Sequence, residues 1–333
     1  MATVLLNPES TVRLSQLIAS KGYPVEEYEV STTDGYVLGI QRIPRGRNES
    51  GRPSERRKTP VFLQHGLLAS STDYVLNFPE QSLGFLLADA GYDVWLGNNR
   101  GTRYTRHKWL TRFEKEFWDF SADELSTIDL PAMLDFVLKK TGQKRLHYVG
   151  WSQGALMMFA LLSEKPAYNG KINLFSAIGP VPYIGHTWSP IRLLVPFSNL
   201  IAWQLGLFGA DITMNTGILN MLGKNLCPTP SFRLICNTPL MLMADINDNQ
   251  MNHIKPPSYS LARTKVPVAI YWSQNDWLAS ETDVRHLRDD LPNVVSFYKV
   301  PDPQFTHIDF GWGCNATKIL YEPMIKEMKK YGH

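Results

Sequence analysis

Apolar and polar positions follow two different patterns along the chain. Short continuous apolar runs end in glycine, proline or polar turn residues: PVFLQHG, YDVWLGNNRG, RLHYVGWS, INLFSAIGP, VPVAIYWS and VVSFYKVP. Such runs are typical of strands that are buried on both faces of a parallel sheet. Segments with helical spacing lie between several of them, so the pattern predicts an α/β fold with a mostly parallel sheet and helices on both faces.

Capping and turn residues indicate where the helices and one hairpin lie in the sequence. The segment NPESTVRLSQLIASKG is predicted to be a helix that ends at Gly22, and SLGFLLADAG is predicted to be another. The segment SADELSTIDLPAMLDFVLKKTG begins at Ser121 with an acidic first turn and ends with two lysines and Gly142, as the helix dipole and C-capping favour. EEYEVSTTDGYVLGIQRI predicts a hairpin that turns at Asp34-Gly35.

The alternation of strands and helices stops between about Tyr183 and Ile254, where apolar residues follow helical spacing. We therefore expect three parts. Residues 1–182 form the first part of the core, residues 183–258 a helical cap inserted into it, and residues 259–333 the second part. Most apolar residues of the cap are expected to form its own core.

Composition narrows the classes of function. The 333 residues are 44% hydrophobic, and their net charge of +3 is too balanced to point to a nucleic-acid partner. The longest apolar stretch, residues 191–210, contains Arg192 and Pro196, which argues against a transmembrane segment. No signal peptide is visible at the N-terminus. Asn48 and Asn315 nevertheless lie in N-glycosylation triplets, which matter only on the secretory route.

The stretch LHYVGWSQGALMMF carries the first chemical signal. Ser152 lies between Gly150 and Gly154, after a predicted strand and before a predicted helix, which is the context of a nucleophile elbow. In such a turn the serine adopts a strained backbone conformation, and glycines leave room for the neighbouring chain. An ordinary strand-to-helix turn is the competing interpretation until partners for the serine are found.

A nucleophilic serine needs a base and a group that orients the base. Asp276 follows the strand VPVAIYWS, and His307 follows the strand VVSFYKVP. Both lie downstream of Ser152 at the carboxyl ends of strands, in the order serine, acid, histidine that α/β-hydrolases use. Taken alone, Asp276 is an ordinary turn aspartate and His307 a loop histidine. Together the three are predicted to be the catalytic residues.

Three other carboxylates compete with Asp276 for the role of the acid. Asp283 is expected inside a helix or at its start, and Asp302 lies in the loop that approaches His307. Asp309 comes two residues after His307 and is expected to cap a helix. These positions make Asp276 the preferred acid.

Backbone N–H groups are expected to stabilise the oxyanion that forms during ester cleavage. The N–H of Gln153, directly after the serine, is one predicted donor. Leu67, which follows the strand-ending pair His65-Gly66, is predicted to supply the other. A simple strand-ending turn is the competing interpretation of His65-Gly66.

Longer stretches resemble one family. The segments FLQHGLLASSTDYV, ADAGYDVWLGNNRGTRY, EFWDFSADELSTIDLPAMLDFVLKKTGQKRLHYVGWSQG and THIDFGW are similar to the acid lipase family, and the similarity runs from near Asn7 to the C-terminus. The resemblance implies an α/β-hydrolase core with a helical cap, and part of the cap surface is expected to cover the serine and face lipid. It also implies hydrolysis of triacylglycerols or cholesteryl esters at a lipid–water interface without a cofactor, and a secreted or lysosomal protein. It supports the three predicted catalytic residues and both oxyanion donors.

The cysteines add one implication of the resemblance. Cys227, Cys236 and Cys314 allow one disulfide with one thiol left over, and they do not have metal-ligand spacing, so no metal site is predicted. The resemblance implies that Cys227 and Cys236 form the disulfide.

The chain departs from the family pattern at two internal places. Trp151 stands before the serine where the family usually has histidine, and the stretch from Cys236 to Pro256 is several tens of residues shorter than the resemblance predicts. The preferred interpretation is a serine lipase or esterase. The alternatives are a catalytically impaired lipid-binding variant caused by the shortened cap, and a related hydrolase such as a thioesterase or peptidase.

Overall fold

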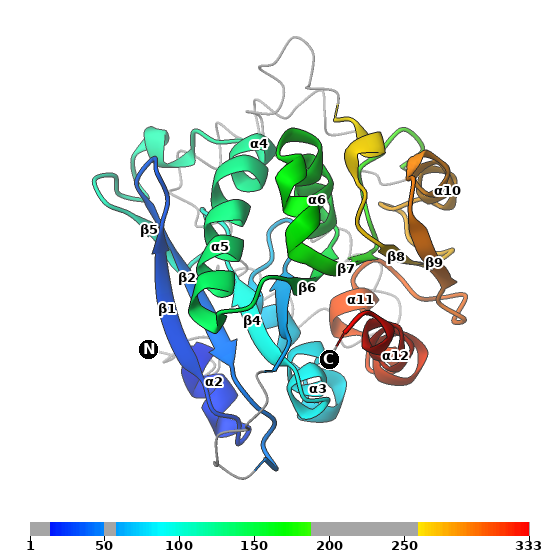
Figure 1. The fold of residues 1–333 in the computed structure, drawn as a ribbon, viewed down its shortest axis with the longest axis horizontal. Coiled ribbons are helices and arrows are strands. Elements are labelled where there is room, and N and C mark those ends of the chain that lie inside the picture. Colours follow the sequence, from blue (N-terminus) through cyan, green and yellow to red (C-terminus); the bar gives the residue numbers. More distant parts are fainter. Residues whose placement is uncertain (1–13, 50–57, 188–258, 333) are drawn as a thin grey trace, which may run out of the picture.

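The protein is described here by a computed structural model that covers residues 14–49, 58–187 and 259–332. In these residues a nine-stranded sheet forms the centre of the fold (Figure 1). Its order is β1-β2-β4-β3-β6-β7-β8-β9, and β5 pairs with β2. The strands are β1 (Glu26–Ser31), β2 (Tyr36–Ile43), β3 (Pro60–Gln64), β4 (Asp93–Gly97), β5 (Thr105–His107), β6 (Leu146–Trp151), β7 (Ile172–Ile178), β8 (Val268–Trp272) and β9 (Val294–Lys299).

β2 is the one strand of the described sheet that runs opposite to the others, because it is antiparallel to each of its neighbours, β1, β4 and β5. β1 and β2 form the predicted hairpin, with Tyr28 opposite Ile40 and a turn in which Gly35 has a φ of 104°. β2 is also antiparallel to β4, whereas every neighbouring pair from β4 to β9 is parallel. The predicted mostly parallel sheet is therefore confirmed. Its six parallel strands end at one common edge of the sheet, where parallel α/β folds place their chemistry.

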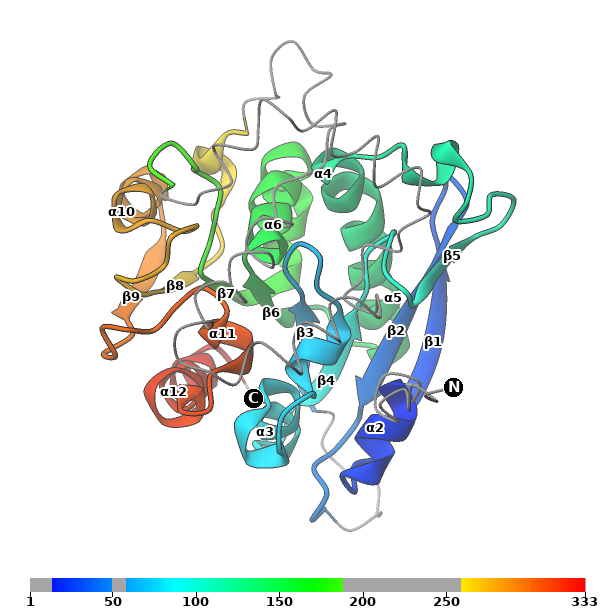
Figure 2. The same cartoon turned by 180° about the vertical axis from the view of Figure 1, so that it is seen from behind.

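Helices cover both faces of the sheet, as the pattern predicted (Figures 1 and 2). One hydrophobic core lies under α5 (Leu130–Thr141), α6 (Gln153–Glu164) and α10 (Glu281–Asp290). The other lies under α2 (Leu14–Ser20), α3 (Leu83–Asp89) and α12 (Glu322–Met328). Two shorter helices are α4 (Ala122–Glu124) and α11 (Asp309–Trp312). Because both faces are covered, five of the six parallel strands are buried along almost their whole length, which explains their continuous apolar sequences, whereas β9 at the edge of the sheet is only half-buried.

The helix predicted from Ser121 to Gly142 is present but is not a continuous α-helix. α4 and α5 are separated by a π-helical segment, Leu125–Asp129. Pro131 lies at the start of α5 and has no N–H to donate to the carbonyl of Thr127, four residues earlier. The ammonium group of Lys165 donates to that carbonyl instead, at 2.7 Å. The helix ends at Gly142, whose φ of 66° is the predicted left-handed C-cap.

Most of the predicted cap, residues 183–258, lies outside the described residues, and so do Cys227 and Cys236. β7 and β8 are adjacent parallel strands, so the predicted cap is inserted in the sequence between two neighbouring strands of the sheet. The domain boundaries and the disulfide stay predictions. No helix in the described part of the chain is both long and apolar enough to cross a bilayer.

Candidate active site

Ser152 connects β6 to α6 in a strained conformation, with a φ of 55° and a ψ of −116°. A positive φ is unfavourable for a residue with a side chain and is found where the surrounding structure enforces it. A Cβ atom on Gly150 would lie 2.6 Å from the carbonyl oxygen of Gly154, and one on Gly154 would collide with the carbonyl oxygen of Gln64. Gly150 therefore leaves room for the start of α6 above the strand, and Gly154 allows the turn to pass close to the end of β3.

His307 and Asp276 are in direct contact, although 31 positions separate them in the sequence. The Nδ1 of His307 lies 2.7 Å from Oδ2 of Asp276, and both side chains are buried. The other oxygen of Asp276 accepts the N–H groups of Leu278 and Ala279, at 2.9 and 2.8 Å. These bonds hold the carboxylate so that it engages Nδ1, which leaves Nε2 of the ring for a second partner.

The histidine ring lies against the residues that flank the serine. The Ser152 N–H donates to the carbonyl of Ile178 at 2.9 Å, and a Cβ atom on the following residue, Gly179, would be 3.2 Å from Cε1 and Nδ1 of His307. The rings of Trp151 and His307 have centroids 6.0 Å apart. The structure therefore brings all three predicted catalytic residues to the carboxyl edge of the sheet, from the ends of β6, β8 and β9.

The three competing carboxylates are engaged elsewhere. Asp283 lies in the first turn of α10 and accepts bonds from His186 and Ser280. Asp302 accepts the N–H of Gln304 at 2.9 Å. Asp309 is the first residue of α11, and its carboxylate accepts the N–H and hydroxyl of Thr306, at 2.7 Å each. The preference for Asp276 is therefore consistent with the contacts of all four carboxylates.

The loop after β3 approaches the serine closely. A Cβ atom on Gly66 would be 3.2 Å from Cβ of Ser152 and 3.7 Å from its Oγ. Leu67 follows in a half-buried turn, and Leu68 has a φ of 56°. Gln153 is the first residue of α6, so its N–H has no acceptor within the helix. Gln153 thus directly follows the serine, and Leu67 directly follows the glycine that approaches it. The strained Leu68 could not be predicted, because leucine carries no sequence signal for a positive φ.

Buried amides fix this loop. Asn98 accepts the N–H of Ser71 at 3.0 Å and donates to Oε1 of Gln41 at 3.0 Å. His65 accepts the N–H of Asn99 through Nε2 at 3.3 Å and donates from Nδ1 to the carbonyl of Gly66 at 2.8 Å. Burial lowers the pKa of His65 to about 4, so its ring is neutral and can play both parts. The sequence offered only the Asn-Asn pair in NNRG as a hint of this network.

A buried carboxyl connects the same loop to the segment that carries His307. Asp73 accepts the N–H of Ser70 and the indole N–H of Trp312, each at 3.3 Å. Trp312 is the last residue of α11, which begins two residues after His307. Desolvation by burial raises the pKa of Asp73 to about 7. Nothing in the sequence distinguished Asp73 from a surface carboxylate.

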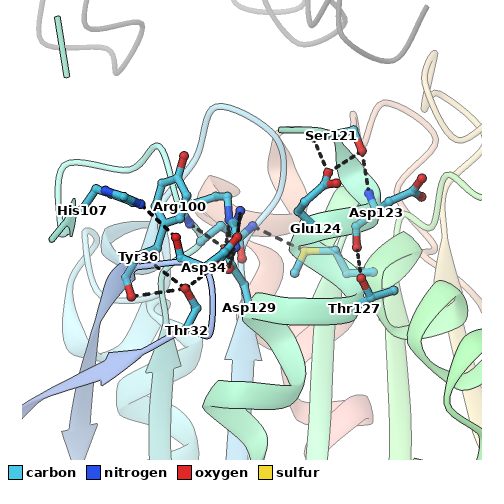
Figure 3. Close-up of polar contacts among 12 residues, drawn as sticks. Thr32, Asp34, Tyr36, Arg100, His107, Ser121, Asp123, Glu124, Thr127 and Asp129 are labelled. Atoms are coloured by element: carbon cyan, nitrogen blue, oxygen red, sulfur yellow. Dashed lines mark hydrogen bonds and ion pairs between the residues drawn. The ribbon is translucent and has the colours of Figure 1, made fainter. Parts of the chain in front are cut away.

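The loop after β4 is fixed by a buried cation. Figure 3 shows Arg100 between Asp34 and Asp129, with ion pairs of 2.7 Å to each. Its guanidinium group also lies 4.0 Å from the ring centroid of Tyr36. Burial raises the pKa of Asp129 to about 6 although Arg100 opposes the shift. The network joins the turn between β1 and β2, the start of β2 and the π-helical segment to the loop that begins at the carboxyl end of β4.

Trp151, where the resemblance leads us to expect histidine, packs beside the serine turn. Its ring is buried, and a Cβ atom on Gly311 would lie 2.9 Å from it. The ring therefore fills the space between the serine turn and α11. Its indole N–H is buried and has no hydrogen-bond partner among the described residues.

The remaining predicted sites lie at the surface. Asn48 and Asn315 are both exposed, and the side chain of Asn315 donates to Asp302 at 3.1 Å. Cys314 is an exposed free thiol. The described residues contain no group of three or more histidine, cysteine or acidic side chains arranged to hold a metal ion.

Solved structures share the fold. A putative lipase from Acinetobacter baumannii superposes with a TM-score of 0.61 at 14% identity, over 99% of this chain and 100% of that one. An esterase from a Rhodococcus species superposes with a TM-score of 0.57 at 18% identity, over 92% of this chain and 99% of that one. At such low identity the likeness concerns the fold alone. It confirms the predicted α/β-hydrolase fold.

Sequence comparisons identify the family. A profile described as the partial alpha/beta-hydrolase lipase region matches residues 14–78, and one for the alpha/beta hydrolase fold matches residues 59–199. Human Lipase member K is 35% identical over 98% of this chain and 92% of its own length. Human lysosomal acid lipase/cholesteryl ester hydrolase is 34% identical over 98% and 93%, and bovine gastric triacylglycerol lipase is 33% identical over 98% and 94%.

The alignment with Lipase member K runs over 375 positions, more than the 333 residues of this chain, so that relative has residues without a counterpart here. This agrees with a shortened segment but does not locate it. Identity above 30% over nearly the full length of both proteins, together with the matching profiles, confirms the predicted resemblance. The chain therefore belongs to the acid lipase family, a family of carboxylic ester hydrolases with the α/β-hydrolase fold.

Proposed function

We propose that this protein hydrolyses carboxylic esters of lipids through Ser152, His307 and Asp276. The hydroxyl of Ser152 attacks the ester carbonyl while Nε2 of His307 takes its proton. The alkoxide of the ester then leaves with that proton, and the acyl group stays on the serine. A water molecule, deprotonated by His307, attacks the acyl-enzyme and releases the fatty acid, which regenerates the serine.

One observation supports this proposal: a histidine whose Nδ1 is held by a buried, doubly hydrogen-bonded carboxylate packs near Gly179 and Trp151, next to the strained serine at the end of β6. The carboxylate keeps the proton on Nδ1 and stabilises the imidazolium that forms during each step. The N–H groups of Leu67 and Gln153 are proposed to receive the oxyanion. Every proton transfer is made by these side chains and water, so no cofactor or metal is needed.

The proposed substrates are esters of glycerol or sterols with fatty acids. The related proteins are named as a triacylglycerol lipase and as a lysosomal acid lipase/cholesteryl ester hydrolase. The cap predicted over residues 183–258, with its disulfide between Cys227 and Cys236, is proposed to cover the serine and provide an apolar route from the lipid. Higher activity on emulsified long-chain esters than on dispersed short-chain esters is the expected result. Equal activity on the two kinds of ester would contradict the proposed role of the cap.

A fluorophosphonate probe tests the chemistry directly. We expect the protein to be labelled, the Ser152→Ala variant not to be labelled, and the two to have the same circular dichroism spectrum. The matched control is Ser163→Ala, because Ser163 lies in α6, away from the elbow, and is also buried. Absence of labelling in the folded wild-type protein would instead support the alternative, an impaired lipid-binding variant.

The proposed location is the secretory route, ending outside the cell or in the lysosome. The exposure of Asn48 and Asn315 and the names of the related proteins support it. When the chain is expressed with a secretion signal, endoglycosidase treatment should increase its electrophoretic mobility. The Asn48→Gln and Asn315→Gln variants should each remove part of that change. A secreted protein without any change would refute the glycosylation.

A further inference from the structure

Two aromatic side chains project into solvent from one segment after β4. Trp109 is 74% exposed and Phe113 is 91% exposed. Both belong to residues 103–116, which we call the aromatic loop. Exposing such large apolar surfaces is unfavourable in water, and their own packing in the fold contributes little in return. Contact with an apolar surface outside the protein would explain their exposure.

The aromatic loop is held firmly although its tips are exposed. Nδ1 of His107 accepts the N–H groups of Trp109 and Leu110, at 3.2 and 3.0 Å, and its Nε2 donates to the carbonyl of Asp34 at 3.0 Å. A Cβ atom on Gly35 would lie 2.5 Å from the indole ring of Trp109, so this glycine is required for the position of the ring.

The second half of the aromatic loop is held as well. The carboxylate of Glu114 accepts the N–H and the hydroxyl of Thr111, at 2.5 and 2.9 Å. The guanidinium group of Arg112 donates to the carbonyls of Gly101 and Thr105, at 3.2 and 3.0 Å. The aromatic tips are therefore presented on a preorganised backbone, which lowers the entropy lost when they are buried by a partner.

The charge of the loop favours an anionic partner. Between residues 103 and 116 there are five arginines or lysines and two glutamates, an excess of positive charge equal to that of the whole chain, +3. Arg106 stays 59% exposed although it pairs with Glu29, and Lys108 and Lys115 are exposed beside the aromatic residues. Aromatic residues that flank basic ones are typical of segments that bind the interface of an anionic membrane.

The loop also lies at the same edge of the sheet as the serine. It begins after the carboxyl end of β4, which is parallel to β3 and hence to β6, the strand that ends at Ser152. β5, inside the loop, pairs with the start of β2, beyond the part of β2 that contacts β4. Figure 1 shows β5 and the segment that leads to α4 at the end of β1 and β2 opposite to α2.

We propose that the aromatic loop docks the protein onto anionic lipid surfaces. Trp109 and Phe113 insert among the lipids, and the exposed side chains of Arg106, Lys108 and Lys115 lie at the level of the anionic headgroups. Because the serine opens at the same edge of the sheet, docking in this way would place it beside the surface that holds its substrate. The biological purpose of this docking rests on the proposed lipid substrate, but the docking itself does not. Binding of the protein to lipid vesicles is therefore measured separately from ester hydrolysis.

Co-sedimentation with phosphatidylcholine vesicles, with and without phosphatidylserine, tests the proposal. We expect stronger binding to the vesicles that contain phosphatidylserine, and about a tenfold or greater loss of that binding in the Trp109→Ala/Phe113→Ala variant. The matched control is Phe78→Ala. Phe78 is also exposed, at 63%, but lies near Lys21 beside α2, away from the aromatic loop, so less than about a twofold change is expected.

Hydrolysis of a soluble short-chain ester is measured on the same proteins and should be the same in all of them. Vesicle binding that the double variant retains in full, or that Phe78→Ala reduces equally, would overturn the docking surface. Equal binding to both kinds of vesicle would overturn the role of the charges. If the wild-type protein binds vesicles but cleaves no soluble ester, the proposed reaction fails while the docking surface stands.

Discussion

Asp73 offers a test of how the loop after β3 is held, through the substitution Asp73→Asn. The wild-type carboxyl is buried between the N–H of Ser70 and the indole of Trp312, and it has no cationic neighbour among the residues that determine its pKa. Burial raises its pKa to about 7. Asparagine has nearly the same shape but cannot ionise. The substitution therefore removes the titration while the cavity stays filled.

The magnitude follows from the pKa difference between the folded and unfolded states. An aspartate has a pKa of about 3.9 in the unfolded chain. Because the folded-state pKa is higher, the folded protein holds the proton more tightly, and the free energy of unfolding falls as the pH rises from about 4 to about 7. Three pKa units correspond to about 4 kcal/mol. Buried His65, whose pKa is lowered to about 4, acts in the opposite direction, since the folded protein loses stability when the pH falls below about 6.5.

The assay is urea unfolding of both proteins, followed by tryptophan fluorescence at a series of pH values. Subtracting the two free energies at each pH cancels the contribution of His65 and of all other groups that the proteins share. We expect the free energy of unfolding of Asp73→Asn, relative to that of the wild type, to rise by up to about 4 kcal/mol between pH 4 and pH 8. A difference between the two proteins that is the same at every pH does not affect this rise. A difference that does not change with pH would refute the raised pKa, and a difference that falls would show that the carboxylate is stabilised in its charged form.

Three further predictions concern the active site and its support. Asp276→Asn should lower the turnover of a soluble ester about 10⁴-fold without loss of the fold, because the amide no longer keeps the histidine in the required tautomer; steady-state kinetics and circular dichroism check this. Gly154→Ala should lower the free energy of unfolding by more than about 2 kcal/mol, since the added methyl group meets a backbone carbonyl; unchanged urea unfolding would contradict it. Arg100→Met should cost about 3–5 kcal/mol because it leaves Asp129 buried without its cation, whereas the exposed Arg106→Met should cost less than about 1 kcal/mol; the same unfolding assay compares them.

The sequence was sufficient to predict the elements that are determined by residues close together in the chain. The apolar runs that became the parallel strands have few polar positions, because helices cover both faces of the sheet. The hairpin at Asp34-Gly35 and the helix end at Gly142 depended on residues that favour a positive φ. Ser152 could be placed for a similar reason, since two glycines around a serine at the junction of a strand and a helix allow few other structures.

The contacts that hold the site could not be predicted in this way. Asp73 and Trp312 are 239 positions apart, and Asn98 and Gln41 are 57 apart, so neither pair has a local pattern. The π-helical segment before α5 is followed by Pro131, which has no N–H, and the carbonyl of Thr127 accepts a bond from Lys165, on a distant part of the chain. Sequence periodicity describes which face of an element is buried, but not which buried polar atoms meet.

These buried polar contacts follow a common pattern around the serine. The loop after β4 is fixed by Arg100, the loop after β3 by Asn98 and His65, and the segment behind His307 by Asp73. Each contact places a polar or charged group where desolvation is costly, and apolar side chains could stabilise the same loops at lower cost. Hydrogen bonds, however, fix distance and direction more narrowly than apolar packing does, and catalysis needs its groups within a fraction of an ångström. Weakening one of these anchors should therefore reduce turnover before it unfolds the protein.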